Sequence, residues 1–128
     1  RLIDPDPSIH QPAAEAWASY ETSCSTLRAE NRLMSGIGAL TMARIEAHYF
    51  INDCFMPDNF IMENISCIAH LPLTIVQGRH DIICPPFTAR QLAEKWGSKA
   101  KLEIIDAAGH STFESGIAHA LMSALEKA

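Results

Sequence analysis

Apolar residues recur every three or four positions through the first part of the chain, roughly residues 7–68, and this spacing predicts helices. The first stripe lies on one helical face and consists of Ala13, Trp17, Tyr20, Cys24 and Leu27. Pro12 suits the first turn of that helix, where the missing amide N–H is not needed. We therefore expect the helix to begin near Pro12, after an acidic loop that contains two prolines.

A second helix is expected after a glycine-containing break at residues 36–38. It should end near residues 52–53, and its apolar positions are Leu40, Ala43, Ala47 and Phe50. Beyond it, Pro57 indicates a loop over residues 54–62, and a short helix is expected over residues 63–68.

The second region, about residues 71–128, alternates between strand and helix patterns. Residues 73–76 (LTIV) are a short β-branched run, and we interpret them as a strand. Residues 102–105 (LEII) are the second strand candidate. Each is followed by a helical stripe, whose members are Ala89, Leu92, Ala93 and Trp96 in the first case and Ile117, Leu121, Ala124 and Leu125 in the second. The order strand, helix, strand, helix predicts an α/β fold with a right-handed crossover and a parallel sheet.

Two strands are too few for such a sheet. Parallel strands are normally buried on both faces and flanked by further strands, and even a stable antiparallel sheet usually needs three or more. No other segment resembles a strand. We therefore expect the missing strands to come from a preceding part of a longer chain or from another copy of this one.

The composition adds mainly exclusions. The chain is 48% hydrophobic and 20% charged, which is typical of a packed globular protein. A formal net charge of −5 and ten scattered basic residues argue against a nucleic-acid partner, since phosphate binding needs clustered Lys and Arg. No apolar run approaches the roughly 18 residues of a membrane span. A signal peptide is not expected either, because no charged segment precedes an apolar stretch at the N-terminus.

The cysteines and histidines do not indicate a metal site. The four cysteines, Cys24, Cys54, Cys67 and Cys84, contain no Cys-x-x-Cys pair and no histidine at zinc-site spacing. We expect reduced cysteines and a cytoplasmic location. Apart from the histidine discussed next, the histidines, including His48 and His80, are interpreted as structural.

Two short motifs that can carry chemistry follow the two predicted strands directly. The first, residues 78–85, contains Asp81, and the second, residues 106–111, contains His110. Active sites in open α/β sheets lie at the carboxyl ends of the strands, so these two side chains can meet. A carboxylate bound to the imidazole Nδ1–H fixes the tautomer, and the imidazole then serves as general base for a nucleophile.

These motifs and two earlier segments resemble the C-terminal part of the proline iminopeptidases, α/β-hydrolases that remove N-terminal proline from peptides. The later segments are residues 71–81 (LPLTIVQGRHD), 84–86 (CPP) and 108–111 (AGHS). Residues 17–21 (WASYE) resemble the family's Trp-x-x-Trp-Glu segment, and residues 43–50 (ARIEAHYF) its Ala-Arg-Ile-Glu-x-His-Tyr-Phe segment. The likeness covers nearly the whole chain, in order.

The resemblance implies roles for four residues. Asp81 would be the acid and His110 the base of a Ser–Asp–His triad. Glu21 and Glu46 would bind the substrate's free amino group. Residues 1–68 would form part of a helical cap, and residues 69–128 the C-terminal part of the α/β-hydrolase core. Two further residues each have two possible interpretations. Trp17 is either part of a pocket wall or part of the core, and Cys84 is either a neighbour of the proline pocket or a small buried residue.

The sequence departs from the family at two points. Tyr20 stands where the family usually has Trp. The nucleophile elbow, Gly-x-Ser-x-Gly, is absent, and Ser111 does not replace it because it lacks the flanking glycines and follows the histidine. Loss of a triad nucleophile lowers turnover by about 10⁶. The chain by itself is therefore expected to be inactive.

We expect a parent enzyme that is a cytoplasmic serine aminopeptidase acting on peptides with N-terminal proline, without metal or organic cofactor. An α/β-hydrolase acting on another ester or amide is the first alternative. A non-catalytic fragment that assembles through its exposed strands is the second.

Overall fold

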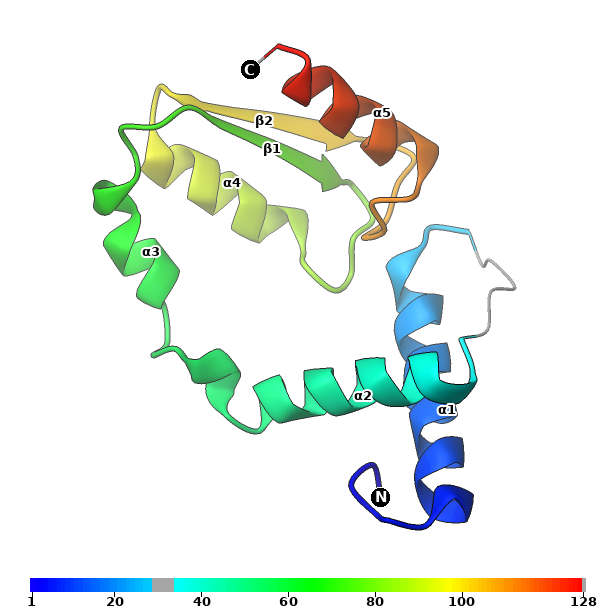
Figure 1. Ribbon diagram of the computed structural model, residues 1–128. Helices are drawn as coiled ribbons and strands as arrows, with labels where there is room; N and C mark the ends of the chain where they lie inside the picture. The colour runs from blue at the N-terminus through cyan, green and yellow to red at the C-terminus, as the bar shows by residue number, and fades with distance from the viewer. Residues whose placement is uncertain (29–33, 128) are drawn as a thin grey trace. The chain divides into compact units, whose positions relative to one another are not determined.

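The computed structural model describes residues 1–28 and 34–127 (Figure 1). Its elements, in chain order, are α1 (Pro7–Ser25), α2 (Gly36–Phe50), the 3-10 helix η1 (Asp53–Phe55), α3 (Phe60–Asn64), the 3-10 helix η2 (Ile65–Cys67), β1 (Leu73–Gly78), α4 (Pro86–Trp96), β2 (Ala100–Ile105) and α5 (Ser115–Leu125). The described residues fall into two compact units, one of residues 1–23 and 34–58, the other of residues 24–28 and 59–127. The expected division into cap and core at residues 68 and 69 stays a prediction.

Helix α1 begins earlier than the apolar pattern predicted. The Asp6 carboxylate accepts a hydrogen bond from the Ser8 amide at 2.8 Å, so that Asp6 caps the helix and Pro7 takes its first position. An Asp cap followed by Pro is a strong start signal, and it prevails over the start expected at Pro12. Pro12 lies inside the helix, and Leu27 lies beyond its end.

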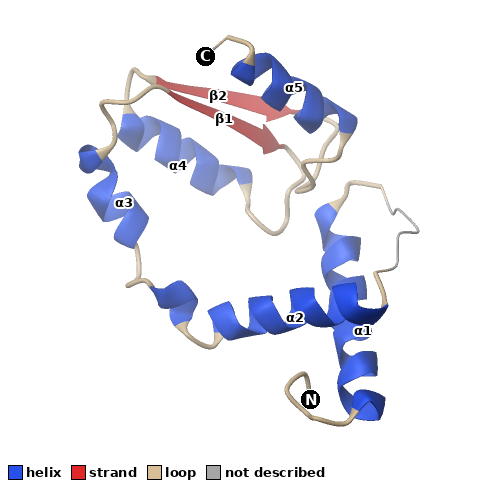
Figure 2. Ribbon diagram, in the orientation of Figure 1, coloured by secondary structure: helices blue, strands red, loops and turns tan. Residues whose placement is uncertain are grey.

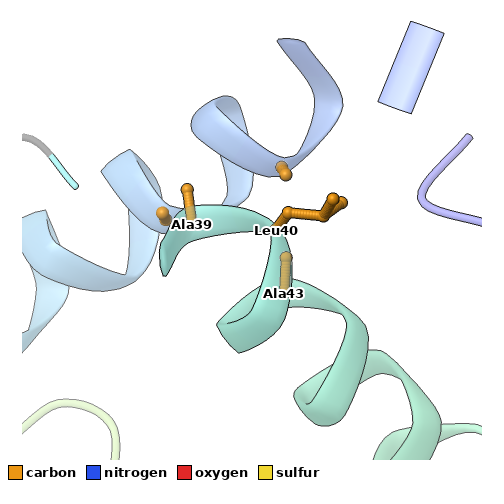
Figure 3. Packing of buried hydrophobic residues seen from close by; sticks show 5 residues of the cluster. Ala39, Leu40 and Ala43 are labelled. Atoms are coloured by element: carbon orange, nitrogen blue, oxygen red, sulfur yellow. The ribbon is translucent and has the colours of Figure 1, made fainter. Parts of the chain in front are cut away.

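The core of the first unit is a contact between α1 and α2 (Figure 3). Small side chains dominate it, and the buried residues are Ala14, Ala18, Ala39, Leu40 and Ala43. Alanines let two helices approach closely, at the cost of burying little apolar surface per residue. Trp17 packs against this core with part of its surface buried, so it belongs to the core.

Two other local expectations for the first part of the chain were wrong. Residues 36–38 form the first turn of α2 rather than a break, with Gly36 at φ 60°, a backbone angle that glycine adopts without strain. Residues 54–62 are not simply a loop, because η1 and the start of α3 lie within them. The short helix expected over residues 63–68 begins at Phe60 and continues as a 3-10 turn.

The second unit contains the predicted strand, helix, strand, helix order. Strands β1 and β2 are parallel, with Leu73 opposite Ala100 and Gly78 opposite Ile105. Helices α4 and α5 cover opposite faces of the pair (Figures 1 and 2). The buried residues of these helices are Ala89 on α4 and Ile117 and Ala120 on α5.

Within the described part of the chain, β1 and β2 pair only with each other. Among these residues both edges of the sheet are therefore unpaired, and the expected completion of the sheet by a preceding part of the chain or another copy stays a prediction. Among the same residues, no helix combines the length and hydrophobicity that crossing a membrane requires.

The alanine contact between α1 and α2 predicts that a larger side chain lowers stability at a buried position of α1 but not at an exposed one. Ala18→Leu should lower the free energy of unfolding by about 1–3 kcal/mol, because Ala18 has no exposed surface and the larger side chain overpacks the contact. Chemical denaturation of the chain measures this. Ala16→Leu on the exposed side of α1 is the matched control and should change stability little; equal effects of the two substitutions would contradict this packing.

Candidate active site at the carboxyl ends of the strands

Asp81 and His110 lie in the loops that follow β1 and β2, and their side chains are in contact. The His110 Nδ1 atom is 3.0 Å from Asp81 Oδ2. With Asp81 ionised, Nδ1 carries the proton and donates it, which leaves the lone pair on Nε2. The His110 side chain is 39% exposed, so a substrate group can reach the imidazole, whereas Asp81 is only 6% exposed.

Backbone amides and a side-chain amide surround the Asp81 carboxylate. Oδ1 accepts hydrogen bonds from the amides of Ile83 and Cys84 at 3.0 and 2.8 Å. Burial raises the pKa of Asp81, but the bonds from the Cys84 amide and from His110 outweigh burial and hold the pKa below its usual value. Asp81 is therefore an anion at neutral pH, with its charge distributed over four donors.

Gln77 is the fourth donor, and the sequence interpretation did not identify it. Its side-chain Nε2 lies 3.1 Å from Asp81 Oδ2, 3.2 Å from the Gly78 carbonyl oxygen and 3.1 Å from the Cys84 carbonyl oxygen. Gln77 is only 9% exposed. A polar side chain near the end of an otherwise apolar strand was the available signal, because a buried amide requires hydrogen-bond partners. Gln77 holds Asp81 and the loop after β1 together.

The backbones of the two loops pack directly against each other. The amide of His80 donates to the Ala108 carbonyl at 3.0 Å, and the Arg79 amide donates to the Ile105 carbonyl at 2.9 Å. A Cβ atom on Gly78 would overlap the carbonyl oxygen of Gly109. Glycine is required at residue 78 for space, and the close approach keeps the two loops in register.

The loop that follows β2 and carries His110, residues 106–111, is called the histidine loop below. The segment Cys24–Arg28, which belongs to the same unit, supports it. The Ser25 carbonyl oxygen accepts hydrogen bonds from the amides of both His110 and Ser111, at 2.9 and 2.8 Å. The backbone on both sides of the imidazole is thereby fixed. Sequence patterns could not reveal this contact, because a backbone carbonyl is common to all residues.

The two glutamates predicted to bind an amino group belong to the other unit and are described there. The Glu46 Oε2 atom accepts a hydrogen bond from Trp17 Nε1 at 2.6 Å, and Glu46 is half-buried on α2. Trp17 therefore both packs in the core and orients this carboxylate. Glu21 is half-buried on α1. The amino-binding roles of both stay predictions.

The interpretation of Cys84 as a small buried residue was wrong, since Cys84 is exposed. The loop turns around the Asp81 carboxylate, and it is the Cys84 backbone that faces the site. Its predicted place near a proline pocket stays untested. In residues 1–28 and 34–127, no three His, Cys, Asp or Glu side chains cluster in a way that could hold a metal ion.

The close approach at Gly78 yields a stability prediction. Gly78→Ala should lower the free energy of unfolding by about 2–3 kcal/mol, because the methyl group forces the histidine loop away from β1. Gly38→Ala within α2 is the control. It should be neutral or stabilising, because alanine is the better helix former and the added methyl group would meet the Met34 side chain at an ordinary contact distance of 3.7 Å. Urea unfolding measures both, and a Gly78→Ala variant as stable as its control would contradict the close approach.

The lowered pKa of Asp81 predicts an acid-dependent loss of stability. Its ionised form contributes stability that is fully present above the ordinary pKa of about 3.9 and is lost as pH falls from there through the lowered folded-state value. Asp81→Asn removes this contribution, so its free energy of unfolding should fall less steeply over that interval. Denaturant unfolding at a series of pH values measures the two slopes; identical slopes would contradict the assignment.

Comparison with known proteins identifies relatives over nearly the full chain. No family model matches. The chain is 41% identical over 132 residues to a protein of Arabidopsis thaliana named proline iminopeptidase, covering 99% of this chain and 34% of that protein. It is 39% identical to a probable proline iminopeptidase of Leptolyngbya boryana, covering 99% of this chain and 41% of the relative. A proline iminopeptidase of Xanthomonas citri is 37% identical, with 98% and 42% covered.

The chain thus spans between about a third and two-fifths of the length of these curated relatives. The matched region is the C-terminal part of the longer proteins. The chain is therefore a homologue of the C-terminal part of the proline iminopeptidases.

Proposed function

We propose that the chain is the C-terminal part of a serine aminopeptidase with an α/β-hydrolase fold, which releases proline from the N-terminus of peptides. The observation that carries this proposal is the 3.0 Å contact between Asp81 and His110 in loops that follow consecutive parallel strands. The names of the relatives support the substrate class. The serine would come from a part of the protein that precedes residue 1.

His110 acts as general base in this proposal. Its Nε2 accepts the proton of the serine hydroxyl while the serine oxygen attacks the carbonyl carbon of the N-terminal proline. The imidazolium that forms is stabilised by the Asp81 carboxylate and then gives its proton to the departing amine. In the second half of the reaction His110 accepts a proton from water as the water oxygen attacks the acyl carbon, and it then gives that proton to the serine oxygen as the bond between the acyl carbon and this oxygen breaks. Asp81 stays ionised throughout, which its four hydrogen-bond donors support.

Glu21 and Glu46 bind the protonated nitrogen of the substrate proline. An exopeptidase must recognise an ammonium group, and a hydrogen bond to a charged group contributes about 1.5–3 kcal/mol. The bond from Trp17 to Glu46 supports this role, because it fixes one carboxylate oxygen in a defined position. The partner of the chain is then a peptide with a free N-terminal proline.

In this proposal, other strands cover the edges of the sheet that are unpaired among the described residues. In the complete enzyme, strands from the preceding part of the protein continue the sheet. They bring the serine to the carboxyl ends of the strands, where Asp81 and His110 lie. The pairing of β1 and β2 with each other alone, among the described residues, also favours a second candidate, in which another copy of the chain covers these edges in a non-catalytic assembly.

Kinetics of the complete enzyme test the proposal with a chromogenic proline amide. His110→Ala should lower kcat by about 10⁶, because the base is lost. Glu46→Gln should raise KM by about 10- to 100-fold, the equivalent of 1.5–3 kcal/mol, because the charge opposite the ammonium is removed.

Glu63→Gln, at an exposed position on α3, is the control and should leave both constants unchanged. An N-blocked proline amide should react far more slowly than the free amine; equal rates would favour the other hydrolase reading. The chain alone, with a mass of 14.1 kDa, should not hydrolyse either substrate. Hydrolysis by a verified 14.1 kDa species would overturn the assignment of an external serine.

A further inference from the structure

The Glu114 carboxylate joins two segments that are distant in the sequence. Glu114 immediately precedes α5, and its Oε1 accepts a hydrogen bond from the Leu27 amide at 2.9 Å. Its Oε2 accepts one from the Gly109 amide at 2.6 Å. The side chain is half-buried, and each oxygen serves a different backbone segment.

Both segments are linked to the backbone around His110. Gly109 is the residue before His110, and Leu27 lies two residues after Ser25, whose carbonyl accepts the His110 and Ser111 amides. The two backbones are closely packed, because a Cβ atom on Gly109 would lie 3.0 Å from the Leu27 nitrogen. Glu114 and the Ser25 carbonyl together therefore fix the histidine loop against the segment Cys24–Arg28.

Helix capping does not explain the Glu114 side chain. The first turn of α5 uses the Glu114 backbone carbonyl, which accepts the Ala118 amide at 2.9 Å and which any residue would supply. The α5 N-terminus has no side-chain cap hydrogen bond. Both carboxylate oxygens are instead committed to amides outside the helix. Hydrogen bonds to an ionised carboxylate are about twice as strong as neutral ones, which suits a side chain that must hold a loop.

We propose that Glu114 is a positioning residue, which holds the backbone of the histidine loop so that the His110 Nδ1 atom meets Asp81 Oδ2. This inference rests on the proposed function, in which His110 is the base. Positioning matters because a displacement of about 1 Å in a catalytic group can lower a rate by about 10². Glu114 acts only through His110 and does not contact the reacting atoms.

Glu114→Gln is the sharpest variant, because glutamine has the same size but only one acceptor oxygen. Its NH₂ group would face one of the two amides, donor against donor, and one hydrogen bond would be lost. Glu94→Gln, at an exposed position on α4 in the same unit, is the matched control. Both variants are made in the 128-residue chain and compared by NMR with the unaltered chain.

Two signals report the position of His110 rather than general stability. One is the low-field resonance of the Nδ1 proton shared with Asp81, and the other is the carboxyl carbon of Asp81, followed through its titration. In Glu114→Gln the proton signal should be lost, and the pKa of Asp81 should rise toward its usual value because the bond from His110 contributes to lowering it. The amide signals of β1 and β2 should persist. In Glu94→Gln both reporters should be unchanged.

The outcomes separate this inference from the proposed function. Absence of the shared-proton signal in the unaltered chain would overturn the Asp81–His110 pair itself. A signal that is present there and unchanged in Glu114→Gln would overturn the positioning role alone. If Glu114→Gln does not fold, through-bond couplings from the Gly109 and Leu27 nitrogens to the Glu114 carboxyl carbon in the unaltered chain decide, and their absence would overturn the inference.

Discussion

The parallel pairing of β1 and β2 is the constraint on which the candidate site depends. Because the strands run in the same direction, both of their carboxyl ends lie at the same end of the sheet. The loops that carry Asp81 and His110 therefore start side by side. The pairing reaches its last register position at Gly78 and Ile105. From there the two loops continue in direct backbone contact, which only a glycine at residue 78 permits.

Burying the Asp81 carboxylate between these loops costs free energy unless its charge is compensated. Burial by itself favours the neutral form of Asp81, so the anion persists only because amide and imidazole donors surround it. Gln77 contributes to this shell from β1, and the amides of Ile83 and Cys84 contribute from the loop. The same set of bonds that stabilises the charge also fixes its orientation toward His110, so the local fold and the proposed chemistry have one physical basis.

The histidine loop receives its support from outside the strand pair. Ser25 and Leu27 come from the segment at the end of α1, and Glu114 comes from the start of α5. The homology to the C-terminal part of proline iminopeptidases is consistent with a unit in which, among the described residues, Asp81 and His110 are in contact while the two strands pair only with each other. In the proposed enzyme, the remaining strands and the serine complete what this loop arrangement prepares.

The sequence by itself determined the α/β order of the second unit, the approximate spans of both strands and the loops of Asp81 and His110, because β-branched runs, prolines and glycines act through local backbone preferences. It also contained the motifs that relate the chain to its family. Local patterns misplaced the start of α1, where the Asp6 cap prevailed over the apolar stripe that begins at Ala13. They did not reveal the roles of Gln77, Ser25 and Glu114. Those roles consist of hydrogen bonds between segments as distant as Leu27 and Glu114, 87 positions apart, and only the tertiary structure brings such donors and acceptors together.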